Sequence, residues 1–129
     1  MIEIEICVDV PDLAGGVRFY AEAFGFSKDS EPFPGVAYLK LGDAKITLLQ
    51  KRERTKPSPR TNDERRYDRH WTPVHLDFHV DDLKAALDRA VSAGATLEQL
   101  FEDQDGSAAF CADPFGHGFC LLQRKAPAG

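Results

Sequence analysis

Val80-Asp81-Asp82-Leu83-Lys84-Ala85 is the stretch that decides the fold, because the chain carries a second version of it, Val10-Pro11-Asp12-Leu13-Ala14. Each version follows an alternating apolar run and opens a segment with helical spacing that ends at a glycine, Gly25 or Gly94. Each half then closes on a similar run, 45–51 in the first half and 118–124 in the second. The chain is therefore an internal duplication of one βα unit with later strands, and two copies can build a single sheet with a cleft between them.

The expected elements follow from the period of the apolar residues. Strict alternation predicts a half-buried strand over Ile2–Val10, and Asp12 and Gly25 are typical of the start and end of the helix that follows. The same reasoning predicts a second helix over Leu83–Ala93, capped by Asp82. The remaining predicted strands are Val36–Leu41, Lys45–Gln50, Val74–Val80, Thr96–Phe101, Ser107–Ala112 and His117–Arg124.

We predict one domain over residues 1–129, with repeat 1 at about 1–50, a linker at 51–72 and repeat 2 at about 73–124. The linker holds eight basic and four acidic residues, and almost no aliphatic side chain precedes Trp71. A loop of this length is a solvated linker, a lid over the cleft or an arm that reaches a second subunit. Trp71 is expected to anchor the linker to the sheet.

The composition narrows the function classes. A formal net charge of −5 argues against a general nucleic-acid binder. The sequence has no pattern of a secretory leader and no apolar run of membrane-spanning length, so we expect no membrane partner. Three cysteines cannot all pair within one chain, which favours free thiols and a cytoplasmic protein.

Several motifs together resemble the vicinal oxygen chelate superfamily, which includes glyoxalase I, bleomycin- and fosfomycin-resistance proteins and extradiol dioxygenases. They are the helix entry Val-x-Asp-Leu, Phe19-Tyr20 on the first helix, the turn Asp113-Pro114-x-Gly116, His75-Leu76-Asp77 and Phe119-Cys120-Leu121. The last two are similar to motifs of bacterial glyoxalase-like proteins. The resemblance implies an α+β fold, with two βαβββ repeats that form one curved mixed sheet with a cleft and helices on its outer face. It also implies a homodimer.

Metal enzymes of that superfamily place ligands at four equivalent points, on the first and last strands of each copy. The matching residues here are Glu5, Thr47, His75 and Cys120, and only His75 has the usual identity. Thr47 is a poor ligand, and a cysteine suits zinc better than iron or manganese. We therefore expect no metal or other cofactor; if a divalent metal is bound, its ligands would be Glu5, His75 and Cys120.

The polar faces of these strands should form the floor of the cleft, as a small-molecule pocket with a few converging polar groups. The candidate substrate-binding residues are Glu5, Cys7, Thr47, His75, Asp77 and Cys120. An alternative is that these groups only satisfy one another, for example Glu5 with His75.

The expected function is that of a glyoxalase/bleomycin-resistance/dioxygenase-like protein that binds a small organic molecule in the cleft between its repeats. Whether it is an enzyme stays open. One alternative is a metal-dependent lyase or dioxygenase that uses Glu5, His75 and Cys120. The other is a non-catalytic dimeric binding module.

Overall fold

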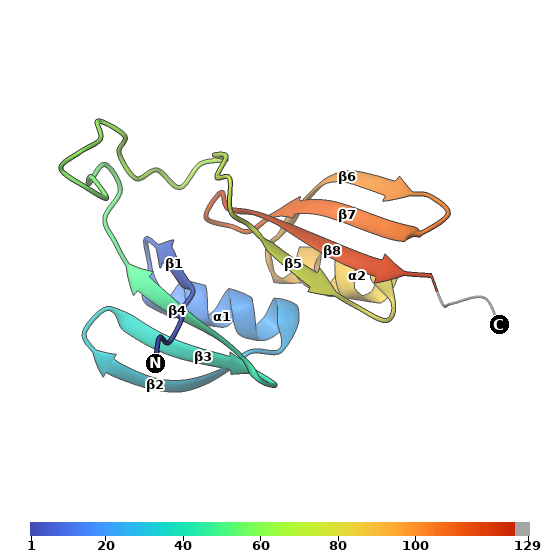
Figure 1. Cartoon of the computed structure of the whole chain (residues 1–129), viewed down its shortest axis with the longest axis horizontal. Helices are drawn as coiled ribbons and strands as arrows, with labels where there is room; N and C mark the ends of the chain where they lie inside the picture. Colours follow the sequence, from blue (N-terminus) through green and yellow to red (C-terminus); the bar gives the residue numbers. More distant parts are fainter. Residues whose placement is uncertain (126–129) are drawn as a thin grey trace. The chain divides into compact units, whose positions relative to one another are not determined.

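A computed structural model describes residues 1–125 of the chain, which divide into two compact units, Met1–Tyr67 and the part from Asp68 onward (Figure 1). The first unit contains β1 (Cys7–Val10), α1 (Leu13–Phe24), β2 (Ser27–Phe33), β3 (Val36–Leu41) and β4 (Ala44–Gln50). The second contains β5 (Leu76–His79), α2 (Leu83–Ala93), β6 (Thr96–Glu102), β7 (Gly106–Ala112) and β8 (Gly118–Arg124). The duplicated βαβββ order predicted from the sequence is confirmed.

Each unit has its own four-stranded mixed sheet, in the order β1-β4-β3-β2 or β5-β8-β7-β6. The first strand of each unit pairs in parallel with the last strand of the same unit, and the other neighbours are antiparallel. The resemblance implied one continuous sheet, whereas backbone pairing over residues 1–125 gives two four-stranded sheets. Alternation along a strand indicates which side chains share a face, but it does not identify the neighbouring strand.

The start of the helix is fixed in the same way in both units. The N-cap aspartate accepts a hydrogen bond from a backbone N–H three residues later, and a glutamine of the last strand accepts one from the first helical N–H. The donor and acceptor pairs are Gly15 to Asp12 (3.2 Å), Ala85 to Asp82 (3.1 Å), Leu13 to Gln50 (2.9 Å) and Leu83 to Gln123 (2.7 Å). The duplication thus extends to individual hydrogen bonds.

Gly16 lets α1 pack closely against its sheet. A Cβ atom at this position would lie 3.1 Å from both Leu48 Cδ1 and Val10 Cγ1. Val10 and Leu48 are themselves fully buried, so the contact belongs to the core of the first unit. The second unit has an equivalent core between α2 and its sheet, in which Ala90 and Leu121 are buried.

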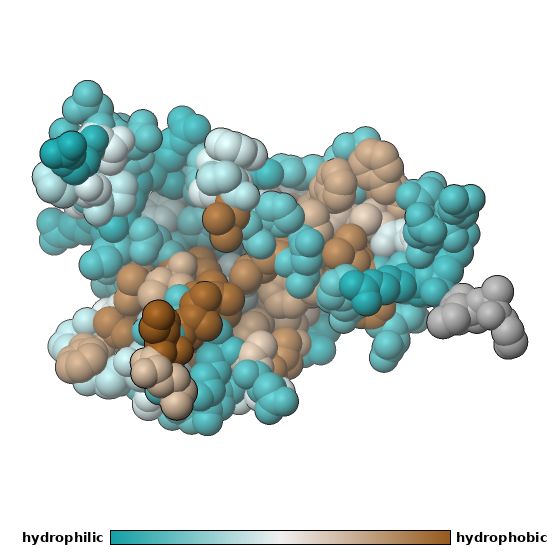
Figure 2. Space-filling view, viewed as in Figure 1, coloured by the Kyte–Doolittle hydropathy of each residue, from teal (hydrophilic) through white to brown (hydrophobic). Residues whose placement is uncertain are grey.

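The N-terminal stretch differs from its prediction. The structure begins β1 at Cys7 rather than Ile2, and Ile2 and Ile4 are 97% and 93% exposed. Strongly hydrophobic side chains accordingly lie on the surface near the N-terminus in Figure 2. β4 pairs in register with residues 7–10, and its Thr47 N–H also donates to Ile6 O (2.8 Å). Within the first unit, the part of the apolar alternation before Ile6 therefore has no paired strand.

The basic segment predicted as a linker is shared between the units, because the division falls after Tyr67. Within the first unit it is closed by backbone hydrogen bonds from Arg54 N–H to Arg65 O (2.7 Å) and from Arg65 N–H to Thr55 O (2.8 Å). The Arg65 side chain also forms an ion pair with Asp9, with 2.8 Å between Nε and Oδ2. The segment is therefore a folded loop held by specific contacts in its first part.

Candidate functional site

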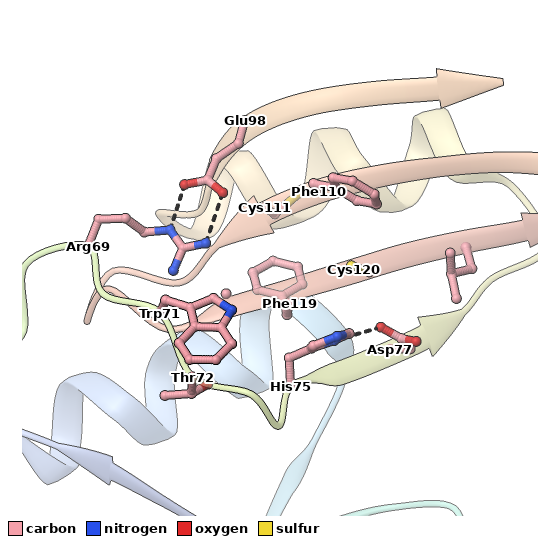
Figure 3. Close-up of a pocket in the computed structure, with 12 residues that line it drawn as sticks. Arg69, Trp71, Thr72, His75, Asp77, Glu98, Phe110, Cys111, Phe119 and Cys120 are labelled. Atoms are coloured by element: carbon pink, nitrogen blue, oxygen red, sulfur yellow. Dashed lines mark hydrogen bonds and ion pairs between the residues drawn. The ribbon is translucent and has the colours of Figure 1, made fainter.

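A pocket of about 380 Å³ lies on the second unit, and its lining combines aromatic, charged and potential ligand side chains (Figure 3). The aromatic members are Trp71, Phe110 and Phe119. The polar members include Arg69, Glu98, His75, Asp77 and Cys120. Its size and mixed lining fall within the range of small-molecule sites.

The sheet of the second unit sets the floor of this pocket. Asp77 on β5 pairs in register with Cys120 on β8, and Phe110 on β7 pairs with the same cysteine. Residues in register on neighbouring strands point to the same face, and so does His75, two residues before Asp77. The strand register thus brings Asp77, Cys120 and Phe110 together on one face, and His75, which directly precedes β5, lies beside Asp77.

His75, Asp77 and Cys120 form a compact cluster whose ligand atoms all lie within 4.8 Å of one another. His75 Nδ1 is 3.0 Å from Asp77 Oδ1. Burial raises the pKa of the Cys120 thiol to about 11, and the charge of Asp77 and a hydrogen bond to Asp77 act in the same direction. Cys120 therefore carries a neutral thiol at pH 7 unless a cation is bound to it.

Arg69 and Glu98 form a two-bonded ion pair at the edge of the pocket, visible as two dashed lines in Figure 3. The distances are 2.6 Å from Nε to Oε2 and 3.0 Å from Nη2 to Oε1. The hydrogen bonds from Arg69 lower the pKa of Glu98, and those to Glu98 raise the pKa of Arg69. The two charges cancel within the pocket wall.

The turn between β7 and β8 holds the segment that carries Arg69. His70 N–H donates to Gly116 O (3.2 Å), and the His70 and His117 rings join through Nε2 and Nδ1 (2.8 Å). Gly116 has φ +87° and a Cβ there would collide with the Asp68 carbonyl oxygen, so glycine is required. The turn predicted from Asp113-Pro114-x-Gly116 is thus also the attachment point for the residues beside the pocket.

Trp71 differs from its prediction. The sequence predicts that it anchors the linker to the sheet, yet it is 80% exposed and lines the pocket. The anchoring contacts come instead from Arg69 and His70, whose polar groups bond to the turn and to β6.

The predicted site residues fall into two groups. His75, Asp77 and Cys120 come together in the second unit. In the first unit the Thr47 hydroxyl donates to the Glu5 carboxylate. Cys7 is exposed by surface area, but nearby protein atoms still partly desolvate its thiol, and this partial desolvation raises its pKa, followed by the charges of Glu5 and Asp9. The alternative contact between Glu5 and His75 would join the two units, and it stays a prediction.

Arg69, Glu98 and Phe110 were not recognised from the sequence. Glu98 and Phe110 lie on strands with ordinary patterns, and their roles depend on the register of β6, β7 and β8. Arg69 was counted among the basic residues of the linker, and only its positive charge could have pointed to a role in the pocket.

The residue types of the site also bear on metal binding. Of the four superfamily points, Thr47 is a neutral hydroxyl and Cys120 is a thiol, a set that does not fit a hard ion such as Mn²⁺. The clustered donors in the second unit are instead one imidazole, one carboxylate and one thiol.

Within residues 1–125, neither helix is long and apolar enough to cross a bilayer.

Curated relatives match only part of the chain. An uncharacterised protein of Mycobacterium bovis is 43% identical over 54 residues, which cover 40% of this chain and 36% of that protein. An uncharacterised protein of Mycobacterium tuberculosis has the same identity over 54 residues, or 32% of its length. The match thus spans about a third of the length of these relatives.

Solved structures share the fold over nearly the whole chain. A glyoxalase/bleomycin resistance protein/dioxygenase family enzyme from Burkholderia phytofirmans has a TM-score of 0.72 and 20% identity, covering 94% of this chain and 97% of its own. Fosfomycin resistance protein FosX from Mesorhizobium loti has a TM-score of 0.71 and 18% identity, with coverage of 97% and 95%. A mutant of FosX from Listeria monocytogenes, complexed with Mn(II) and 1S,2S-dihydroxypropylphosphonic acid, has a TM-score of 0.70 and 16% identity, with coverage of 95% and 90%.

Residues 5–122 match the family described as the glyoxalase-like domain. Together with the repeated βαβββ fold and its structural neighbours, this match shows that the chain belongs to the glyoxalase-like family of the vicinal oxygen chelate superfamily.

Proposed function

We propose that the protein binds a small organic molecule in the pocket of its second unit. The observation that carries this proposal is the convergence of aromatic walls with a few polar groups in a cavity of about 380 Å³. Trp71 and Phe110 offer apolar surface, and His75 and Asp77 offer hydrogen-bonding groups that remain about half exposed to a ligand. The contribution of Glu5, Cys7 and Thr47 in the first unit stays a prediction, as does the expected cleft between the repeats.

The charges of the pocket favour a neutral or cationic ligand. The positive charge of Arg69 is already matched by Glu98 through two hydrogen bonds. Asp77 adds a negative charge to the floor, and the aromatic faces of Trp71 and Phe110 attract cations. An anionic ligand would have to displace Glu98 from Arg69 before it gained a full ion pair.

A screen by thermal shift tests the proposal, because a ligand that binds only the folded protein raises its melting temperature. The metal-free protein, kept in EDTA, would be screened against neutral aromatic alcohols, aromatic amines and 1S,2S-dihydroxypropylphosphonic acid as the anionic probe. We expect shifts with members of the first two classes and none with the phosphonate.

Variants separate the pocket from the rest of the surface. His75→Ala should weaken a hit by about 1–3 kcal/mol, the scale of a lost polar partner, as measured by calorimetry. Lys84→Ala, on the solvent face of α2, is the matched control and should leave the affinity unchanged. No shift from any neutral or amine compound, or equal binding by His75→Ala, would contradict the proposal.

The expected homodimer stays a prediction, which sedimentation equilibrium would check against the chain mass of 14.3 kDa. The lyase or dioxygenase alternative and the non-catalytic dimeric module also stay predictions.

A further inference from the structure

The charge of the pocket depends on three side chains. Of the described residues that line it, Arg69 is the only lysine or arginine, and Asp77 and Glu98 are the only carboxylates. In Figure 3 the Arg69–Glu98 pair lies on one side of Phe119 and Asp77 on the other. One positive charge thus stands against two negative ones, and a change in either member of the pair would alter this balance.

The guanidinium of Arg69 is largely engaged by protein acceptors. Its Nε and Nη2 atoms donate to the two carboxylate oxygens of Glu98. Its Nη1 atom donates to the carbonyl oxygens of His70 and Gly116. A guanidinium has five N–H groups, so these four bonds leave at most one of them for a ligand. Arg69 is therefore a part of the pocket wall, and an anion would have to compete for it.

The position of Arg69 does not depend on Glu98 alone. A Cβ at Gly118 would lie 2.9 Å from Arg69 Nη2 and 3.3 Å from Nη1, so the guanidinium packs against the backbone at the start of β8. The hydrogen bonds from Arg69 lower the pKa of Glu98, which is accordingly charged at pH 7. A glutamine in place of Glu98 would keep an acceptor oxygen for Arg69 and remove only the charge.

We propose that Glu98 sets the charge class of the ligand, and that the pocket takes an organic cation with an aromatic ring. Glu98 cancels the charge of Arg69, so that the charge a ligand meets is that of Asp77, which is 42% exposed. The faces of Trp71 and Phe110 add to the attraction for a cation. The inference deepens the proposed function and rests on it, because it names the charge of the same ligand and the residue that selects it.

The two members of the ion pair lead to opposite expectations. Loss of the Glu98 charge leaves the charge of Arg69 uncompensated, which weakens the binding of a cation and strengthens that of an anion. Loss of the Arg69 charge leaves Glu98 uncompensated and has the reverse effect. A pair that served only to hold the fold would instead weaken the binding of every ligand in both variants.

The test uses the full chain in EDTA at pH 7 and three probes of similar size that differ mainly in charge: benzylamine, benzyl alcohol and benzoate. By titration calorimetry, the wild-type protein should bind benzylamine at least about 10-fold more tightly than benzoate. Glu98→Gln should lower this ratio of affinities by at least about 10-fold, and Arg69→Gln should raise it. The protein with both substitutions should return to nearly the wild-type ratio.

Glu102→Gln is the matched control. It removes the same charge from an exposed position of the same strand, outside the pocket, and should leave the ratio unchanged. Circular dichroism of each variant checks that it is folded. If Glu98→Gln does not fold, Arg69→Gln still tests the proposal, because it must shift the ratio toward the cation.

Three results would overturn the proposal. They are wild-type protein that binds benzoate as tightly as benzylamine, equal shifts of the ratio in Glu98→Gln and Glu102→Gln, and shifts of the same sign in Glu98→Gln and Arg69→Gln. Binding of benzyl alcohol that His75→Ala weakens would, in each of these cases, leave the proposed function standing. Failure of all three probes to bind would count against both.

Discussion

Asp113→Ala should destabilise the protein strongly, because the Asp113 carboxylate organises the turn between β7 and β8. Asp113 is only 4% exposed, and its Oδ1 accepts hydrogen bonds from Phe115 N–H (2.9 Å) and His117 N–H (3.0 Å). Alanine would leave both donors without this acceptor, at about 1–3 kcal/mol each for a buried group. Phe115 is buried and His117 is half-buried, so water can reach the second donor more easily. We therefore expect a total loss of about 3 kcal/mol in the free energy of unfolding.

Urea unfolding followed by far-ultraviolet circular dichroism would measure the effect. With a slope of about 2 kcal/mol per molar urea, a loss of about 3 kcal/mol shifts the midpoint by about 1.5 M. Asp113→Asn is the matched control, since its amide oxygen can accept from the same two N–H groups without the charge, and it should lose about 1 kcal/mol. Two results would refute this account of the turn. One is a free energy of unfolding for Asp113→Ala within about 0.5 kcal/mol of the wild-type value, and the other is an equal loss of stability in the two variants.

Three further predictions rest on the cysteines and on the basic loop. Alkylation by iodoacetamide at pH 8, followed by mass spectrometry, should modify the exposed Cys7 well before Cys120. The reason is that a pKa of about 11 leaves roughly one Cys120 thiolate in a thousand at pH 8. The rate of Cys120 alkylation should therefore rise about tenfold per pH unit toward pH 11. Because the folded pKa of Cys120 is raised, its neutral thiol stabilises the fold below about pH 9, and that contribution is lost as pH rises toward 11. Equal alkylation of the two thiols at pH 8 would contradict the raised pKa of Cys120. Asp9→Ala removes the ion pair with Arg65 and should speed trypsin cleavage within residues 51–66. An unchanged cleavage pattern would show that the loop does not depend on this contact.

Strong periodicity and capping residues made most of the fold predictable. The sequence predicted α1 and α2 because Asp12 and Asp82 cap them and Gly25 and Gly94 end them, and the structure confirms these caps. β2 was not assigned from the sequence, because all seven of its residues are exposed and mostly polar and so carry no apolar alternation. The extent of the first strand was overestimated for the opposite reason, since Ile2 alternates well but has no partner strand in the first unit.

The residues that line the pocket were predictable only where strand register follows directly from the repeat. His75 and Cys120 were identified because they occupy equivalent points of the first and last strands, and Asp77 because it shares a strand face with His75. Arg69 and Glu98 were missed, because their ion pair joins residues 29 positions apart through the turn at Gly116. No local pattern encodes that contact.

The glutamines that bond to the first turn of each helix also couple the folding of each unit into one step. Gln50 reaches back 37 residues to Leu13, and Gln123 reaches back 40 residues to Leu83. Each glutamine can accept this hydrogen bond only after the last strand of its unit has docked, so a contact that is distant in sequence adds to the stability of the helix start. Each half of the chain should therefore fold cooperatively, with no long-lived state in which its helix is fully formed but its final strand is absent.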